Sequence, residues 1–389
     1  MGTEAVKRPL LEVAKLFLKL GVLSFGGPAA HIALMEQEVV KKRNWLTREH
    51  FLDLLAAVNI IPGPNATEMA AHIGYVHAGW LGLIVGGFLF LLPGSIISLG
   101  LGVLYQRYGM LPQVSAMFSG ITPVVMAVIL FSTYRLGRTA LTDIVSVLLF
   151  AASLASSLLG VNELVTLLAS GALSLFVFSL LRPDSGGGSA LMRAWVPFGF
   201  LMPAVGSLLT TPNDRLFRLG LFFLKVGALL FGSGMVLFAF IQRDVVSRFG
   251  WLTQQQLIDA IAVGQMTPGP VLSAVTFIGY LVQGIPGAAV STLAVFLPSF
   301  ILVAVTGPWI PRLRSSAPVR AFLKGVNSAV VALILAIGIR LFGSVITDAW
   351  AVLILVVSVG ALLSQRVDTA WLVPGGAAIG LLRHLLFPK

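Results

Sequence analysis

The sequence predicts an all-α polytopic integral membrane protein made of two homologous halves, and three observations support this fold class. The first is composition: 57% of the 389 residues are hydrophobic and only 11% are charged, whereas a soluble domain is about 25% charged. The second is that uncharged stretches such as 80–106 and 260–311 exceed the roughly 20 apolar residues that cross a bilayer. The third is an internal repeat.

The repeat places the same motifs in the same order in both halves. Pro-Gly-Pro at 62–64 returns 206 residues later at 268–270. After one deletion the offset becomes 205, which aligns Asp143 with Asp348. In an apolar chain, two copies of one half are typical of a transporter whose site lies between the repeats.

Each half is expected to contain the same series of elements. An apolar helix leads to a Gly-rich break, a polar loop follows, and two short apolar segments are joined at Pro-Gly-Pro. No strand-like alternation competes with the helical interpretation. Four hydrophobic runs complete each half, near 80–105, 113–135, 143–160 and 163–181 in the first and near 285–306, 321–341, 349–364 and 369–386 in the second.

The chain divides into an N-terminal transporter repeat, 1–181, a linker, 182–214, and a C-terminal transporter repeat, 215–389. The linker begins with a Gly/Ser-rich segment of flexible composition. It also contains an uncharged run, 194–213, that has no partner in the first half and that reverses the second half if it crosses the membrane. The distribution of Lys and Arg fits that arrangement in part. Inverted repeats are therefore the favoured interpretation, and parallel repeats stay open.

The paired Pro-Gly-Pro breaks are the best candidates for a binding site. Proline disfavours helix at the residue before it and suits the first position of a new helix. The N–H groups of residues 65–67 and 271–273 are then expected to be unpaired, and a helix N-terminus attracts anions. A simple proline hinge between packed helices is the alternative. The expected contacts are Pro64, Asn65, Pro270 and Val271, with Asn59 and Gln265 as side-chain donors just before the breaks.

The Gly-rich breaks are the second candidate, because glycine allows irregular backbone and close approach to a ligand. Close helix–helix packing through small residues is an equal alternative. The substrate contacts expected here are Phe25, Gly26 and Gly27 in the first half, and Phe231, Gly232 and Ser233 in the second.

Several charged residues lie in or next to apolar segments. Lys19 and Lys225 occupy the same repeat position, where they could attract an anion or reach the interface with long side chains. Glu68 has Ala274 as its counterpart and could carry a coupling proton or line an aqueous vestibule, as could His72. The repeated residues Arg135 with Asp143, and Arg340 with Asp348, are expected to anchor helix ends.

Other classes of protein find little support in the sequence. The chain contains no cysteine, which removes disulfides and thiolate metal sites. It has no Walker A loop and no His-Glu-x-x-His motif. The net charge of +11 comes from Lys and Arg in short loops, as membrane topology requires. We therefore expect no enzyme, no cofactor, no metal and no nucleic-acid partner.

The ordered set of motifs resembles the chromate ion transporter (CHR) family in its long, two-domain form. The first half carries Phe-Gly-Gly-Pro at 25–28, Trp-Leu-Thr at 45–47, Pro-Gly-Pro at 62–64 and Ile-Gly-Tyr at 73–75. The second carries Phe-Gly-Ser-Gly at 231–234, Trp-Leu-Thr at 251–253, Thr-Pro-Gly-Pro at 267–270, Ile-Gly-Tyr at 278–280 and Phe-Leu-Pro-Ser-Phe at 296–300. The second half departs from Gly-Gly-Pro with Gly-Ser-Gly at 232–234, so the two half-sites differ.

This resemblance implies a multi-pass protein of the inner (plasma) membrane that exports chromate and confers resistance to it. Alternating access driven by the membrane potential, by proton exchange or by both fits the export of a dianion. Sulfate or another oxyanion is the alternative substrate and the natural competitor. A membrane-embedded enzyme and an anion channel are alternatives of other classes. A homodimer stays open as a further level of assembly.

Overall fold

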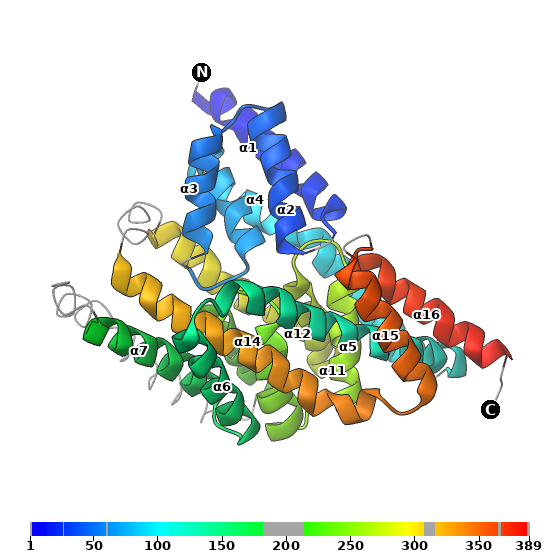
Figure 1. Cartoon of the computed structure of the whole chain (residues 1–389). Helices are drawn as coiled ribbons and strands as arrows, with labels where there is room; N and C mark the ends of the chain where they lie inside the picture. The colour runs from blue at the N-terminus through cyan, green and yellow to red at the C-terminus, as the bar shows by residue number, and fades with distance from the viewer. Residues whose placement is uncertain are drawn as a thin grey trace.

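The computed structural model describes residues 2–25, 27–59, 61–109, 111–181, 214–306, 316–364 and 367–386. Over these residues every regular element is helical, which confirms the all-α fold class (Figure 1). The Gly/Ser-rich linker and the uncharged run 194–213 lie outside the described residues, so the expected extra crossing stays a prediction.

The first half begins with a helical hairpin that turns back at the Gly-rich break. Helix α1 (Gly2–Leu23) is followed by α2 (Pro28–Glu36) and the π-helical turn η1 (Gln37–Lys42). Lys19 Nζ lies 2.9 Å from Glu38 Oε1 although 19 residues separate them. The second arm therefore runs back alongside the first, and the break lies at the inner end of the hairpin.

A second hairpin turns back at the Pro-Gly-Pro break. Helix α3 (Arg48–Val58) leads to the break and the first part of α4 (Asn65–Tyr108) returns from it. The Trp45 ring stacks on His77 with centroids 3.7 Å apart, so both arms end at the same side. The chain then turns sharply at Gly79, whose φ is 65°, and α4 continues as a long apolar helix.

The second half repeats this construction. Its first hairpin consists of α9 (Arg215–Leu229), α10 (Val236–Phe240) and π-helical η2 (Ile241–Arg248), and Lys225 Nζ lies 2.8 Å from Asp244 Oδ2 across it. Its second consists of α11 (Gln254–Met266), the 3-10 turn η3 (Val271–Ser273) and the start of α12 (Ala274–Thr306). Helix α12 also turns sharply, at Gly284 with φ 60°. The expected helix breaks are thus present in both halves.

Three further helices complete each half, where the hydrophobic runs predict them. They are α5 (Pro112–Ala140), α6 (Ile144–Leu158) and α7 (Glu163–Leu181), and then α14 (Ala317–Val345), α15 (Ala349–Leu363) and α16 (Thr369–Leu386). Asp143 and Asp348 cap α6 and α15 by accepting backbone N–H groups at 2.9 and 2.8 Å, which confirms their helix-end role. In the described part of the chain, five helical segments are long and apolar enough to cross a membrane: 65–108, 112–140, 163–180, 271–305 and 317–345.

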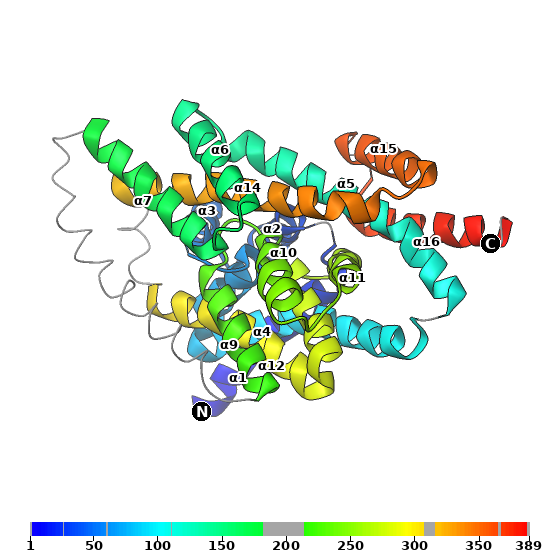
Figure 2. The same ribbon diagram turned by 90° about the horizontal axis from the view of Figure 1, so that it is seen from below.

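Each half packs two of its helices on a helix of the other half. The α6–α7 hairpin of the first half packs on α14 of the second, and the α15–α16 hairpin of the second packs on α5 of the first (Figure 2). Small residues allow both contacts: a Cβ on Gly120 would lie 2.1 Å from the Gly376 carbonyl oxygen, and one on Gly325 would lie 2.2 Å from that of Ser170. Helices α4 and α12 also pack on each other between the halves.

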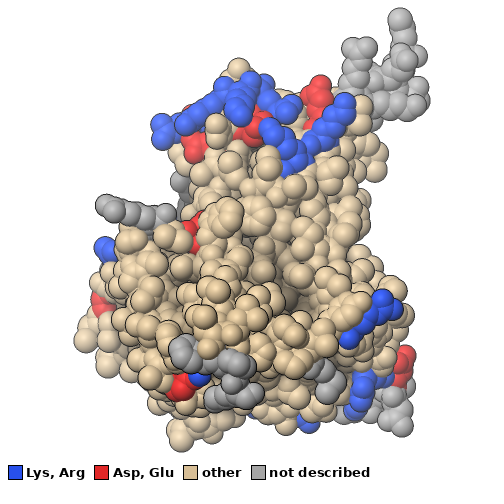
Figure 3. Space-filling model, turned by 90° about the vertical axis from the view of Figure 1, so that its right-hand side faces the viewer, with Lys and Arg blue, Asp and Glu red and all other residues tan. Residues whose placement is uncertain are grey.

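Charge is concentrated at one end of the molecule. Figure 3 shows Lys and Arg gathered most densely over the outer ends of the first-half hairpins, above a broad band that is mostly uncharged, with further Lys and Arg toward the opposite end. The basic residues there include Lys42 and Arg48, whose side chains are 54% and 78% exposed. An uncharged band next to a basic end is the pattern expected of a protein embedded in a bilayer.

Candidate functional site

The four helix breaks meet at the interface between the halves. The Gly63 N–H donates to the Leu230 carbonyl at 2.6 Å, and the Gly269 N–H donates to the Ser24 carbonyl at 2.7 Å. Leu230 and Ser24 are repeat equivalents, as are the two glycines, so the bonds are reciprocal. Each Pro-Gly-Pro break is held against the end of the Gly-rich helix of the other half.

Each break contains a glycine with positive φ. The φ angles are 83° at Gly27, 151° at Gly63, 70° at Gly232 and 82° at Gly269. L-residues with a side chain rarely adopt these conformations. The sequence therefore needs glycine at these four positions to turn the chain inside an apolar environment.

A cavity of about 360 Å³ opens where the breaks converge. That volume lies in the range of ligand pockets, about 300–1,000 Å³. Both Gly-rich breaks and both Pro-Gly-Pro breaks contribute to its wall, with α5 closing one side. The sequence-predicted residues that line it are Gly27, Asn59, Pro64, Asn65, Gly232, Ser233, Gln265, Pro270 and Val271.

Backbone donors at two helix starts belong to this wall. Thr67 and Glu68 donate to the Pro64 carbonyl, so the N–H groups left at the start of α4 are those of Asn65 and Ala66. The expectation that the Thr67 N–H is free was wrong, because the first turn is tight. At η3, Ser273 donates to the Pro270 carbonyl in the same way, which leaves the N–H groups of Val271 and Leu272.

Polar side chains add further donors. Asn65 Nδ2 donates to Asn59 Oδ1 at 2.7 Å, which joins the two asparagines across the break. Ser233 Oγ accepts the Met235 N–H at 3.2 Å, so the hydroxyl proton can still be donated. Gln265 Nε2 approaches Met235 Sδ at 3.4 Å, a weak acceptor that a better one could replace.

The wall carries one positive charge and no carboxylate among the described residues. Arg135 reaches the cavity from α5, and no acidic side chain in the described ranges pairs with it. Its expected role as a helix-end anchor was wrong, because the α6 cap is a capping box of Asp143 and Ser146, and the ion-pair partner of Asp143 is Lys324. An arginine inside an apolar run, repeated as Arg340, was the signal that could have identified it.

His31, a single-copy residue that from sequence could carry a proton or line an aqueous vestibule, also lines the cavity. The residue is 1% exposed and packs edge-on against Phe90 with ring centroids 5.8 Å apart. Neither ring nitrogen has a hydrogen-bond partner in the described structure. A buried unpartnered imidazole at a cavity wall is available to a ligand or to water.

The two predicted lysines lie away from the cavity. Lys19 forms an ion pair with Glu38, and Lys225 forms one with Asp244. The expectation that they attract an anion at the site is corrected by these pairs, because each ammonium group binds a carboxylate on the returning arm of its own hairpin. Phe25 and Phe231 are also absent from the lining, and Gly26 lies outside the described residues.

Glu68 and His72 lie behind the wall of the cavity. They are 1% and 3% exposed, and within the described structure neither Glu68 oxygen nor His72 Nε2 has a hydrogen-bond partner. A Cβ on Gly63 would lie 2.0 Å from Glu68 Oε1 and 2.1 Å from Ser299 Oγ. The carboxyl group is therefore separated from the cavity only by the glycine of the break.

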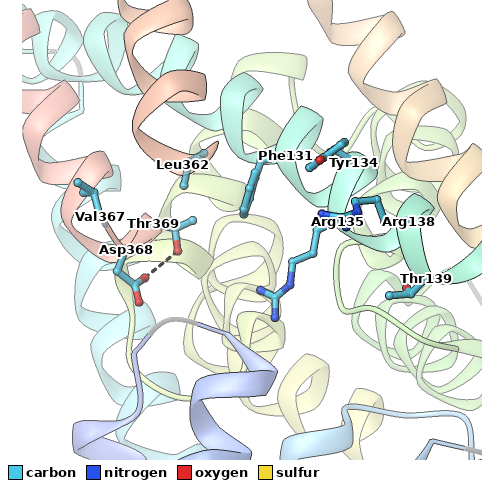
Figure 4. Close-up of a pocket in the computed structure, with 9 residues that line it drawn as sticks. All are labelled: Phe131, Tyr134, Arg135, Arg138, Thr139, Leu362, Val367, Asp368 and Thr369. Carbon is cyan, nitrogen blue, oxygen red and sulfur yellow. Dashed lines mark hydrogen bonds between the residues drawn. The ribbon is translucent and has the colours of Figure 1, made fainter. Parts of the chain in front are cut away.

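A vestibule of about 510 Å³ adjoins the cavity. It lies between α5 and the start of α16, and it shares Phe131, Arg135 and Thr369 with the cavity. Figure 4 shows Arg135 on α5 and Asp368, the residue before α16, facing the same space. The vestibule gives the cavity an access route in which Arg135 stands at the inner end.

Repeated halves, helices broken at the interface and a polar cavity in an apolar chain together define a membrane transporter. The model of the chromate transporter family matches residues 11–175 and again 217–381, once in each half. The chain belongs to this family, which confirms the resemblance in the motifs and the expectation of a transporter rather than an enzyme.

Known proteins similar to this chain extend over most of its length. A chromate transport protein of Cupriavidus metallidurans is 33% identical over 97% of this chain and 94% of the relative. A probable chromate transport protein of Synechococcus elongatus is 35% identical over 82% of this chain and 81% of the relative. A chromate transport protein of Pseudomonas aeruginosa is 31% identical over 85% and 81%. No solved structure matches this chain.

Proposed function

We propose that this protein exports chromate, a tetrahedral oxyanion dianion, from the cytoplasm across the plasma membrane and so confers chromate resistance. Its substrate binds in the cavity at the four breaks. Alternating access opens this cavity first to one side of the membrane and then to the other. The names of three relatives support the choice of chromate. The observation that carries the proposal is the cavity itself, lined by both halves with N–H donors and one arginine.

The donor arrangement suits an oxyanion. A tetrahedral dianion needs several hydrogen-bond donors from different directions, and the two helix starts at Asn65 and Val271 approach from opposite halves. Helix N-termini contribute partial positive charge without a fixed cage of cations. A site built mainly from backbone dipoles and one guanidinium binds the anion and also releases it, as transport requires.

Two inverted halves give this site access from either side. In Figure 1 the first-half hairpins rise above α5 and α14. In Figure 2, seen from below, α10 and α11 lie in front of α2 and α3. Hairpins that open on opposite sides of a shared cavity support the inverted arrangement, in which rocking of one half against the other exposes the site alternately.

The membrane potential supplies the driving force. A potential of 100 mV is worth about 2.3 kcal/mol per charge, so export of a dianion from an inside-negative cell gains about 4.6 kcal/mol. Proton exchange adds to this through Glu68, the buried carboxyl group behind the first break. His72, one helical turn further along α4, extends the same route.

The test is radiolabelled chromate uptake into everted membrane vesicles that contain the full chain. We expect accumulation when the vesicle interior is positive, with inhibition by excess sulfate. Arg135→Gln and Asn65→Asp should each lower uptake at least tenfold, because one removes the single cation that the described residues place in the wall and the other adds a negative charge. Arg107→Gln is the matched control, since Arg107 is an exposed arginine outside the cavity.

The alternatives predict different results. Sulfate accumulation that chromate merely inhibits would assign sulfate as the substrate. Chemically altered chromate would indicate an enzyme, and single-channel currents would indicate a channel. Absence of both chromate and sulfate accumulation under any gradient would refute the proposal.

A further inference from the structure

Two sets of residues at equivalent positions of the repeat differ in the contacts that they make. Arg135 and Asp368 are the counterparts of Arg340 and Glu163, because 340 − 135 and 368 − 163 both equal 205. The arginines lie on α5 and α14, and the acids lie at the starts of α16 and α7. The helices of each set are packed on each other across the interface between the halves.

The residues of the set at Arg340 are held together by contacts. The Arg340 guanidinium donates to the Ser157 carbonyl and interacts electrostatically with Glu163. Glu163 is only 2% exposed, and its carboxylate also pairs with Arg243 at 3.3 Å. These contacts hold Arg340 of α14 against the end of α6 and the start of α7.

The residues of the set at Arg135 line open space instead. The counterparts of Arg340, Ser157 and Glu163 are Arg135, Leu362 and Asp368, and all three line the vestibule of about 510 Å³. Both Arg135 and Asp368 are exposed. Figure 4 shows the two side chains on different walls, with Phe131 between them and Thr369 bonded to Asp368. Equivalent residues are therefore joined by contacts at Arg340 and line open space at Arg135, although both helix pairs remain packed on each other.

We propose that Arg135–Asp368 and Arg340–Glu163 are the two gates of the transport cycle, an inference that rests on the proposed function. The structure shows the state in which the Arg135 gate is open and the Arg340 gate is closed. In the opposite state Arg135 closes on the Leu362 carbonyl and Asp368, while Arg340 leaves Ser157. Exchange of the two conformations between the repeats converts one state into the other.

The open gate also selects the substrate. An entering oxyanion meets Arg138 and Arg135 in the vestibule, and of these two only Arg135 also borders the cavity. A guanidinium that holds the oxyanion cannot bind Asp368 at the same time. The gate therefore closes only after the anion has moved on to the helix breaks, and Arg135 is a specificity residue for an oxyanion as well as a gate residue.

The two gates are not equally strong. Arg243, which pairs with Glu163, has Gln37 as its counterpart, since 243 − 206 = 37. The Arg135 gate therefore has no cation at the matching position to reinforce its closed form. The extra ion pair between Arg243 and Glu163 favours closure of the Arg340 gate, so the resting transporter favours the state with the open vestibule.

The test measures distances between repeat-matched spin labels by pulsed electron paramagnetic resonance. The chain has no cysteine, so Tyr134→Cys/Val367→Cys labels the open gate and Asn162→Cys/Ile339→Cys labels the closed one. In lipid nanodiscs without substrate, we expect a longer distance for the first pair than for the second. Arg243→Gln should increase several-fold the population in which the first distance is short and the second long. Equal distances in both pairs, or no effect of Arg243→Gln, would overturn the proposal.

A second measurement connects the gates to transport. A cleavable cross-link across positions 134 and 367 should stop chromate uptake into everted vesicles, and cleavage should restore it. Unreacted thiols are alkylated first, because chromate oxidises them. Full uptake by the cross-linked protein would overturn the assignment of Arg135 and Asp368 as a gate. The distance measurement needs no substrate, so a failure of the proposed chromate transport can be told apart from a failure of the gates.

Discussion

The two Pro-Gly-Pro breaks share a backbone and differ in their surroundings. Both central glycines have positive φ and donate reciprocal hydrogen bonds across the interface. A Cβ on Gly63 would lie about 2 Å from Glu68 Oε1 and Ser299 Oγ, whereas the nearest atom to a Cβ on Gly269 is the Phe90 carbonyl oxygen at 3.5 Å. Backbone geometry therefore forms the cavity from both halves, while a buried ionisable group lies only behind the first break among the described residues.

The ion pairs of the hairpins show a second difference of this kind. Lys225 and Asp244 are 15% and 8% exposed and pair only with each other among the described salt bridges. Lys19 is 49% exposed, and its partner Glu38 also binds Lys42 and Arg43. The same repeat position is therefore held by an isolated buried pair in one half and by a redundant network in the other.

Substitution of the break glycines should separate the two breaks most strongly. Gly63→Ala adds backbone strain of about 1–3 kcal/mol and overpacking of about 1–3 kcal/mol, whereas Gly269→Ala adds the strain alone. We expect a clearly greater loss for Gly63→Ala in the free energy of unfolding, measured by denaturant titration in detergent micelles. Equal losses in the free energy of unfolding would show that Glu68 and Ser299 can move aside without destabilising the fold.

Removal of the hairpin lysines is the next largest contrast. Lys225→Ala leaves Asp244 buried without its partner, which costs about 3–5 kcal/mol of stability. Lys19→Ala leaves Glu38 with two cations and should cost below about 1 kcal/mol. The same denaturant titration measures both. A double variant, Lys225→Ala/Asp244→Ala, should recover part of the loss, and no recovery would contradict the assignment to an unpaired charge.

Replacement of Glu68 tests whether the difference between the breaks has a function. Glu68→Gln keeps the size of the side chain and removes the titrating group. We expect everted vesicles to retain chromate uptake driven by the potential and to lose its response to an imposed pH gradient. Thr67→Ser, at the neighbouring buried position, serves as the control. A normal response to the pH gradient in Glu68→Gln would exclude Glu68 as the coupling site.

The smallest effect concerns pH and the first-half network. The hydrogen bond from Lys19 lowers the pKa of Glu38 from 4.5 to about 2. A lowered acid pKa stabilises the fold above pH 4.5 and loses this contribution as the pH falls toward 2. We expect the melting temperature to fall over this window, and Glu38→Gln should flatten that part of the profile. An unchanged profile in the variant would assign the acid sensitivity to other carboxylates.

The sequence by itself predicts most of the fold. The apolar runs place the long helices because bilayer thickness sets their length. The repeat places matching breaks, and glycine and proline mark them because few other residues permit the backbone found at Gly63 and Gly269. The residues at the four breaks were predictable for the same reason, since their conformational requirements are local.

Which charges reach the cavity depends on packing between distant parts of the chain. Lys19, Lys225 and Arg135 are all cations in or beside apolar segments, and local sequence does not distinguish them. The lysines are taken up by carboxylates on the returning arms of their own hairpins, whereas Arg135 faces a space formed by α16 of the other half. The difference between the open and closed gates has the same origin, because exchanged helices bring together residues such as Arg135 and Asp368 that lie far apart in the chain.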